Sequence, residues 1–177
     1  LFGCAQTGTG KTAAFALPII HRLMQSGVPS AKVRRPIRAL ILAPTRELAI
    51  QIAECVAAYS KNTPIRHSLV FGGVSQVPQV RSLQKGIDIV IATPGRLCDL
   101  MGQGFVDLSH VETFVLDEAD RMLDIGFRPD IEKILRRCPR DRQTLLLSAT
   151  VPPPIRRLAE RYMYQPEVLN FSPKNLS

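Results

Sequence analysis

The chain has 177 residues, of which 45% are hydrophobic and 21% charged, close to the averages of a soluble globular protein. This length suits one domain, and the composition excludes a disordered tail, a collagen-like repeat and a disulfide-stapled miniprotein. The apolar runs are far shorter than the ~18 residues that span a bilayer, so we expect no membrane partner. We expect no signal peptide. Because it begins at Leu1 rather than methionine, we expect it to be part of a longer protein.

The formal net charge is +8, from 23 basic and 15 acidic side chains. Such an excess favours a polyanionic partner such as nucleic acid, although an ordinary basic surface gives the same number. Two basic clusters, at residues 32–38 and 136–142, either contact this partner or are merely solvated.

The four cysteines have neither CxxC nor other metal-binding spacing, and their neighbours are mostly apolar. This pattern predicts small buried side chains rather than a zinc or redox site. It also predicts a reducing compartment, so we expect the protein to be cytoplasmic. The cysteines are Cys4, Cys55, Cys98 and Cys138.

Short apolar runs alternate along the chain with longer stretches that have the period of a helix. Because the runs are apolar on consecutive residues, they predict strands buried on both faces, which is typical of a parallel sheet. The predicted strands are Leu1–Cys4, Ile37–Leu42, His67–Phe71, Ile87–Ile91, Phe114–Leu116, Thr144–Leu147 and Val168–Phe171.

The intervening stretches, such as residues 131–138, carry apolar stripes with three- and four-residue spacing. Strand–helix alternation predicts an α/β fold, a predominantly parallel sheet with helices on both faces. Pro18 removes a backbone donor from the first predicted helix, so we expect a kink or an early end there. The segment Gln25–Pro36 is predicted to be an exposed connection. We place one domain over residues 1–171 and the start of a linker over residues 172–177.

The segment Ala5-Gln6-Thr7-Gly8-Thr9-Gly10-Lys11-Thr12 follows the first predicted strand and opens a helix. Its glycines let backbone N–H groups turn towards phosphate oxygens, and a helix N-terminus adds partial positive charge. Lys11 can reach the β- and γ-phosphates, and the Thr12 hydroxyl can bind Mg²⁺. Ala5 replaces the first glycine of the strict pattern but still permits the turn. We predict a phosphate-binding loop rather than a plain turn before a helix, formed by Gln6, Thr7, Gly8, Thr9, Gly10, Lys11 and Thr12.

Acidic residues come directly after the predicted strand Phe114–Leu116, in the segment Asp117-Glu118-Ala119-Asp120. Carboxylates are costly to bury at such a position unless a cation or water meets them. Beside a phosphate loop, Asp117 would bind Mg²⁺ and Glu118 would orient the attacking water. Taken alone, the segment is equally compatible with a solvated acidic turn before a helix.

The carboxyl ends of parallel strands share one edge of the sheet, where ligands bind. Small, polar or charged segments follow six predicted strands. They are the phosphate loop, Pro44-Thr45-Arg46, Gly72-Gly73, Thr93-Pro94-Gly95-Arg96, Asp117–Asp120 and Ser148-Ala149-Thr150. Hydroxyls, bare glycine backbone and arginines suit a phosphodiester backbone, whereas aromatic residues are only 6% of the chain, few for a base-stacking platform. Taken alone, Thr93–Arg96 is also an ordinary helix start with an early proline.

In order and spacing, the segments AQTGTGKT, PTRELA, GG, TPGR, DEAD and SAT resemble the first RecA-like domain of DEAD-box RNA helicases, over nearly the whole chain. The stretches RRPIRALILAPTRELAIQI and LDEADRMLDIGF look most like the bacterial RhlE type. The resemblance implies a RecA-like P-loop fold with ATP and Mg²⁺ as cofactors. It also implies RNA as a partner, bound through its backbone without sequence preference, and a second RecA-like domain in the parent chain.

The resemblance further implies roles for individual residues. Lys11, Asp117 and Glu118 would be catalytic, and Thr12 and Asp117 would hold the metal. The residues that grip one RNA strand would be Pro44, Thr45, Arg46, Gly72, Gly73, Thr93, Gly95 and Arg96. Asp120, Ser148 and Thr150 would couple the nucleotide site to strand separation, and a helix after Arg96 would bend the bound strand.

The family segment that reads adenine would precede Leu1, and the second domain with its arginine finger would follow Ser177. We therefore expect the ATP-binding half of an ATP-dependent RNA helicase, which unwinds RNA locally or remodels RNA–protein complexes. Alone, it is expected to bind nucleotide weakly and not to unwind. Two alternatives stay open, a DNA-acting relative and a non-enzymatic RNA-binding module that keeps nucleotide as a structural ligand. The aspartate at position 120 argues against the first, and the intact phosphate loop and acidic pair argue against the second.

Overall fold

The computed structural model describes residues 2–4, 9–27 and 34–170. Every predicted strand is present, with ends shifted by at most two residues within the described part. The strands are Phe2–Cys4 (β1), Ala39–Leu42 (β2), His67–Val70 (β3), Ile89–Ala92 (β4), Thr113–Leu116 (β5), Gln143–Ser148 (β6) and Val168–Asn170 (β7). The helices are Thr9–Gln25 (α1), Arg46–Ser60 (α2), Val77–Gln84 (α3), Pro94–Gly102 (α4), Ala119–Ile125 (α5), Arg128–Arg137 (α6) and Pro153–Tyr162 (α7). The predicted linker at residues 172–177 lies outside the described residues.

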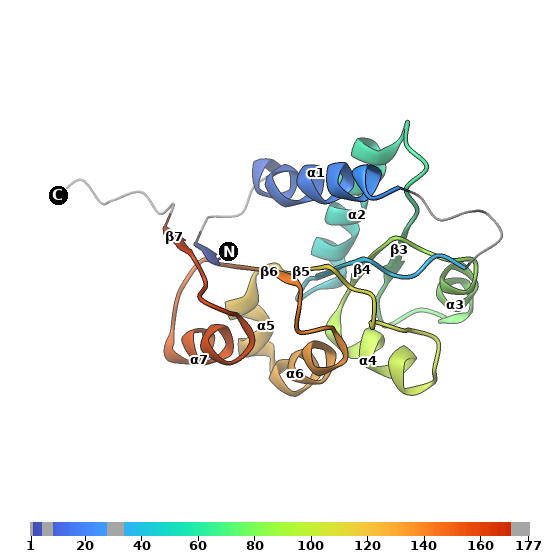
Figure 1. Ribbon diagram of the computed structural model, residues 1–177. Coiled ribbons are helices and arrows are strands. Elements are labelled where there is room, and N and C mark those ends of the chain that lie inside the picture. The colour runs from blue at the N-terminus through green and yellow to red at the C-terminus, as the bar shows by residue number, and fades with distance from the viewer. Residues whose placement is uncertain (1, 5–8, 28–33, 171–177) are drawn as a thin grey trace.

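The described strands form a single seven-stranded sheet in the order β3-β4-β2-β5-β6-β1-β7 (Figure 1). All neighbouring pairs are parallel. The central strands β2, β4 and β5 are in register, with Leu42 opposite Ala92 on one side and Leu116 on the other. The prediction of a parallel α/β sheet is confirmed.

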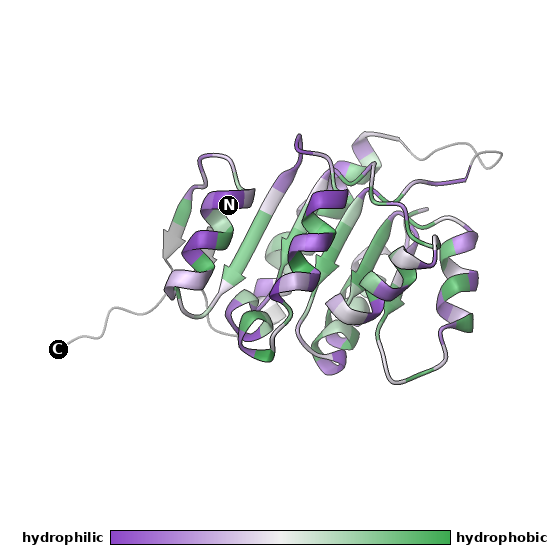
Figure 2. Ribbon diagram, turned by 90° about the horizontal axis from the view of Figure 1, so that it is seen from below, coloured by the Kyte–Doolittle hydropathy of each residue, from purple (hydrophilic) through white to green (hydrophobic). Residues whose placement is uncertain are grey.

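Helices cover both faces of the sheet and create two cores. Helices α1 and α2 lie over one face, and α4 to α7 lie over the other (Figure 1). Consecutive residues of β2 point into opposite cores, since Leu40 packs among side chains of α4 to α7 while Ile41 packs against α1 and α2. The strands are therefore largely hydrophobic, whereas the helices carry both hydrophilic and hydrophobic residues (Figure 2).

Helix α1 continues through Pro18 to Gln25, so the predicted early end is wrong. Pro18 removes the N–H that would bond to the carbonyl of Ala14. Both residues lie on the exposed side of the helix, where water can satisfy that carbonyl. The buried side of α1, which carries Phe15, Ile19 and Leu23, keeps its packing.

A buried cluster of ion pairs lies at the amino edge of the sheet, where the strands begin. The Asp88 carboxylate is fully buried and accepts from Arg35 Nη1 at 2.8 Å, Arg38 Nη2 at 3.1 Å and the backbone N–H of Arg66 at 2.8 Å. Arg35 and Arg38 belong to the basic cluster for which we weighed RNA contact against solvation. Both interpretations are wrong for these two arginines, because a charge this deep requires a paired counter-charge.

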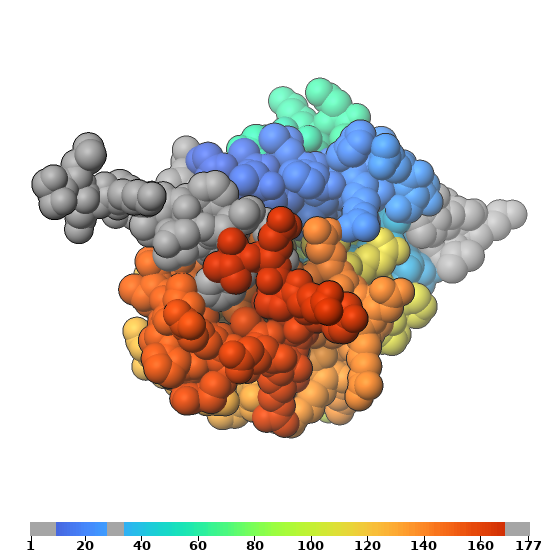
Figure 3. Space-filling model, turned by 60° about the vertical axis from the view of Figure 1, so that its left-hand side comes forward, coloured from blue at the N-terminus to red at the C-terminus, as the bar shows by residue number. Residues whose placement is uncertain are grey.

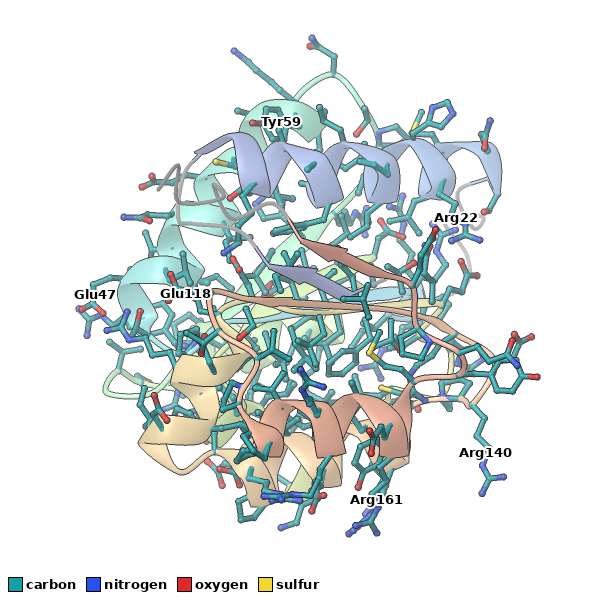
Figure 4. All side chains as sticks on the ribbon, turned by 90° about the vertical axis from the view of Figure 1, so that its left-hand side faces the viewer. Arg22, Glu47, Tyr59, Glu118, Arg140 and Arg161 are labelled. Atoms are coloured by element: carbon teal, nitrogen blue, oxygen red, sulfur yellow. The ribbon has the colours of Figure 1, made fainter. Side chains whose placement is uncertain are left out.

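The second basic cluster, at residues 136–142, is only partly solvated. Arg142 is half-buried and donates to the carbonyls of Pro139 at 2.8 Å and Tyr162 at 3.0 Å, and to the hydroxyl of Thr144 at 3.1 Å. It thereby ties the end of α7 to the start of β6. Arg140 is exposed and extends from the molecule (Figure 4).

Sequence-distant parts meet on one side of the molecule, where α1 lies above the C-terminal third of the chain (Figure 3). Arg22 of α1 donates to Gln143 of β6 at 2.5 Å, which links the two directly. None of the helices in the described part of the chain combines the length and apolar character that crossing a membrane requires.

Three cysteines in the described part, Cys55, Cys98 and Cys138, are free thiols. Burial raises the pKa of Cys98 to about 11 and that of Cys138 to about 12. The prediction of buried side chains is confirmed for Cys138, whereas Cys55 and Cys98 are half-buried.

Candidate functional site

The parallel sheet brings the polar segments together at its carboxyl edge, as predicted. Figure 4 shows Glu118, after β5, and Glu47, in the first turn of α2, on one side of the molecule, with Arg140 on the opposite side. Gln6, Thr7 and Gly8 lie outside the described residues. Of the predicted phosphate loop, the structure therefore describes only the part at the start of α1, from Thr9 to Thr12.

Lys11 and Asp117 form a buried ion pair at this edge. The distance between Lys11 Nζ and Asp117 Oδ1 is 2.6 Å, and the two side chains are 11% and 2% exposed. Burial raises the pKa of Asp117, and the Lys11 ammonium opposes that shift. The Asp117 N–H also donates to the Leu42 carbonyl oxygen at 2.9 Å, which joins the end of β5 to the end of β2.

The surroundings of Asp117 suit a hard divalent cation. Apart from the ion pair with Lys11, the buried Oδ1 has no well-aligned hydrogen bond from the residues that the structure describes. A carboxylate oxygen and a threonine hydroxyl are ligands of the kind that Mg²⁺ takes alongside phosphate oxygens and water. Thr12 is buried and follows Lys11 in the first turns of α1. Asp117 and Thr12 therefore fit the predicted metal site.

Glu118 occupies a strained backbone position between β5 and α5. Its φ and ψ angles are 50° and 51°, in the left-handed region, which non-glycine residues seldom adopt and which is often found at functional sites. Its Oε2 lies 3.5 Å from Arg121 Nη1. The turn directs Glu118 away from the helical path and leaves it at the carboxyl edge beside the Lys11–Asp117 pair.

Asp120, Thr150 and Ser148 form one hydrogen-bonded network. Asp120 Oδ2 accepts from the Thr150 hydroxyl at 2.8 Å and from its backbone N–H at 3.2 Å. The Ser148 hydroxyl donates to the Thr150 carbonyl at 2.6 Å. The acidic segment after β5 is thus bonded to the segment after β6, so the three predicted coupling residues lie together.

The predicted RNA-gripping residues lie on the same edge, over β2, β3 and β4. Thr45 caps α2 by accepting from Leu48 N–H at 3.2 Å. Pro44 and Thr93 are buried, which leaves little of either for contact with a ligand. Arg46 and Gly95 are exposed, and Arg96 is half-buried.

Gly72 and Gly73 differ in whether the backbone conformation requires glycine. Gly73 has a φ of +81°, so its backbone requires glycine. Gly72 has no such φ, and a Cβ built on it would meet nothing within 4 Å. Nothing in the described structure requires glycine at position 72, which leaves a bare stretch of backbone open to solvent.

The helix predicted after Arg96 is α4, which begins earlier, at Pro94, and contains Arg96. The alternative interpretation of Thr93–Arg96 as a helix start is therefore correct as local structure. It does not exclude RNA binding, because the same first turn presents Gly95 at the surface.

A parallel sheet with polar residues at its carboxyl edge defines an α/β protein of the kind that binds ligands at that edge. Residues 1–158 match the model of the DEAD/DEAH box helicase family, and the chain belongs to this family. It is 50% identical to the ATP-dependent RNA helicase CshA of Listeria monocytogenes, over 100% of the chain and 33% of that protein. It is 46% identical to the ATP-dependent RNA helicase RhlB of Pseudomonas aeruginosa, over 99% of the chain and 45% of that protein.

The fold matches a solved member of the family. The crystal structure of a DEAD box protein from Methanococcus jannaschii is 39% identical and superimposes with a TM-score of 0.84, over 97% of this chain and 45% of that one. The chain thus spans about a third to a half of the relatives that it resembles. The RhlE subtype stays a prediction.

Proposed function

We propose that this chain is the ATP- and RNA-binding first core domain of an ATP-dependent RNA helicase that couples ATP hydrolysis to local RNA unwinding or remodelling of RNA–protein complexes. The observation that carries the proposal is the buried Lys11–Asp117 ion pair beside the strained Glu118. The relatives named ATP-dependent RNA helicases support the choice of ATP and RNA.

Lys11 supplies the positive charge for the phosphates. In this structure it is paired with Asp117. With ATP and Mg²⁺ bound, Lys11 would face the β- and γ-phosphates and Asp117 would face the cation. Both buried charges would then have a partner of opposite charge, which avoids the cost of an isolated charge in a dry site.

Glu118 orients the water that attacks the γ-phosphate. Phosphoryl transfer depends mainly on positioning and charge neutralisation, and the left-handed turn holds the carboxylate at the carboxyl edge. Thr12 and Asp117 would hold Mg²⁺, which would neutralise charge on the phosphate oxygens. The opposite side of the γ-phosphate needs an arginine from the second RecA-like domain, so this domain alone hydrolyses ATP near background.

The network of Asp120, Ser148 and Thr150 transmits the state of the nucleotide. Asp120 lies two residues after Glu118, and its Oδ2 holds both donors of Thr150. A shift of the acidic segment on hydrolysis therefore moves the segment after β6.

RNA binds through its backbone on the part of the carboxyl edge over β2, β3 and β4. The exposed guanidinium of Arg46, the first turn of α4 and the bare backbone at Gly72 support this. A side chain at Gly72 would keep a polynucleotide backbone from close approach. Such binding is independent of sequence and falls with salt. A cytoplasmic location stays a prediction.

Steady-state ATP turnover tests the proposal. The 177-residue chain should turn over ATP near background with or without RNA, while the full-length protein should be stimulated by RNA and less by DNA of the same sequence. Because an arginine finger is worth about 10³–10⁵ in rate, robust RNA-dependent turnover by the 177-residue chain alone would contradict the mechanism.

Variants of the full-length protein assign the roles. Glu118→Gln should abolish ATP turnover and leave ATP bound. The control is Glu112→Gln, because Glu112 is exposed and lies just before the start of β5, whereas Glu118 lies after its end. This control should leave ATP turnover unchanged. Lys11→Ala should weaken nucleotide binding by about 1.5–3 kcal/mol in calorimetry, through loss of a charge-assisted contact. Equal binding by wild type and Lys11→Ala would remove Lys11 from the phosphate site.

A further inference from the structure

Two segments of the carboxyl edge meet on one buried side chain, Gln79 of α3. Gln79 is 8% exposed, and both ends of its amide are hydrogen-bonded. Its Nε2 donates to the Phe71 carbonyl oxygen at 3.0 Å, and its Oε1 accepts from Arg96 Nη1 at 3.2 Å. Because Nε2 must donate and Oε1 must accept, these two bonds fix the orientation of the amide.

Arg96 completes the connection on the other side. Its Nη2 donates to the Val74 carbonyl oxygen at 2.8 Å. The turn Phe71–Val74 is thus held at its first residue by Gln79 and at its last by Arg96, and these two side chains also hold each other. Gly72 and Gly73 lie between the two anchor points.

Arg46 packs against the same turn, Phe71–Val74. Its guanidinium carbon lies 5.3 Å from the centre of the Phe71 ring, and its Nη1 lies 3.8 Å from where a Cβ on Gly73 would be. The two arginines lie in the first turns of α2 and α4, the helices that follow β2 and β4. Their relative position is therefore set through the turn Phe71–Val74.

We infer that Gln79 is a positioning residue for RNA binding, which locks the Arg96 guanidinium to the turn Phe71–Val74. The inference rests on the proposed function. Gln79 is too deeply buried to touch RNA. Of the five N–H donors of an arginine, Gln79 and Val74 engage one each, so the others remain available for a phosphate. An arginine fixed before RNA arrives loses less side-chain entropy on binding.

The test is a double-mutant cycle on the full-length protein, with the affinity for single-stranded RNA measured by fluorescence anisotropy over a range of salt. Gln79→Met keeps the length of the side chain and removes both hydrogen bonds, and it should weaken RNA binding about five- to tenfold. Arg96→Ala should weaken binding at least as much and lower the salt slope by about one phosphate contact. In the Arg96→Ala background, Gln79→Met should have no further effect.

The matched control is Gln76→Met. Gln76 precedes α3 and exchanges two hydrogen bonds with Gln103, at 2.8 and 3.1 Å. This variant also removes two side-chain bonds beside the same end of the helix, but none to Arg96 or Phe71. It should bind RNA within twofold of the wild type.

A merely structural role for Gln79 would lower thermal stability and leave the cycle additive, and additivity would overturn the inference. If Gln79→Met does not fold, Gln79→Glu replaces it, because it keeps the acceptor for Arg96 and loses only the donor to Phe71. Gln79→Glu should bind RNA about threefold more weakly, and wild-type affinity would overturn the inference. If Arg96→Ala alone leaves affinity and salt slope unchanged, the proposed RNA surface itself fails, and the inference fails with it.

Discussion

Neutralising Asp88 should lower the free energy of unfolding of the domain and leave its proposed ligand sites unchanged. The change Asp88→Asn keeps the shape of the side chain but removes the only acidic partner that the structure gives Arg35 and Arg38 in the described residues. These two arginine side chains are 11% and 8% exposed, so their charges stay in a nearly dry site. Removing one partner from a buried ion pair costs about 3–5 kcal/mol, against a total stability of about 5–15 kcal/mol for a domain.

Urea denaturation of the 177-residue chain, followed by circular dichroism, measures this loss. The matched control Asp124→Asn makes the same chemical change at an exposed position of α5 and should stay within about 0.5 kcal/mol of the wild type. The melting temperature of Asp88→Asn should fall by about 6–20 °C. A loss below about 1 kcal/mol, or a loss of RNA affinity without a loss of stability, would refute the assignment of Arg35 and Arg38 to the interior.

Three further outcomes follow from the geometry. Thr150→Val removes the 2.8 Å hydroxyl bond to Asp120, so strand separation per ATP hydrolysed should fall while ATP turnover changes little, and equal losses in parallel assays would argue against coupling. Gly73→Ala forces a side chain onto a φ of +81° and should cost about 1–2 kcal/mol in urea denaturation, whereas Gly72→Ala should be neutral for stability but weaken RNA binding. The pKa of Cys138, raised by burial to about 12, means that its thiolate is scarce at pH 8; iodoacetamide should label it slowly in the folded chain and quickly in urea, and fast native labelling detected by mass spectrometry would show that the thiol is accessible.

The sequence predicts the architecture well because of the physics of a parallel sheet. Strands buried on both faces need apolar residues at every position, so runs such as Ile89–Ala92 are recognisable without any knowledge of their neighbours. Parallel strands also end at the same edge, so polar segments that follow them must meet. This places Lys11 near Asp117 and Asp120 near Thr150 before any coordinates are known.

What could not be predicted depends on partners far apart in the chain. A run of arginines shows that charge is present but not which way each side chain points, so the pairing of Arg38 with Asp88, 50 positions away, was missed. The one signal is that Asp88 is an acidic residue inside the apolar run Ile87–Ile91. Gln79 carries even less signal, because nothing in the sequence separates it from Gln76.

The position of β1 inside the sheet has a consequence for how the domain is made. Phe2 pairs with Leu146 on one side and Val168 on the other, so β1 has neither of these sheet neighbours until nearly the whole domain has been synthesised. Closing so long a loop is entropically costly and slow. Helix α1, which carries Lys11, is the next element after this strand, so the proposed phosphate site takes shape only at the end of folding. A chain cut before β6 keeps its central strands β2, β4 and β5 but lacks the strands that pair with β1 beside the proposed nucleotide site.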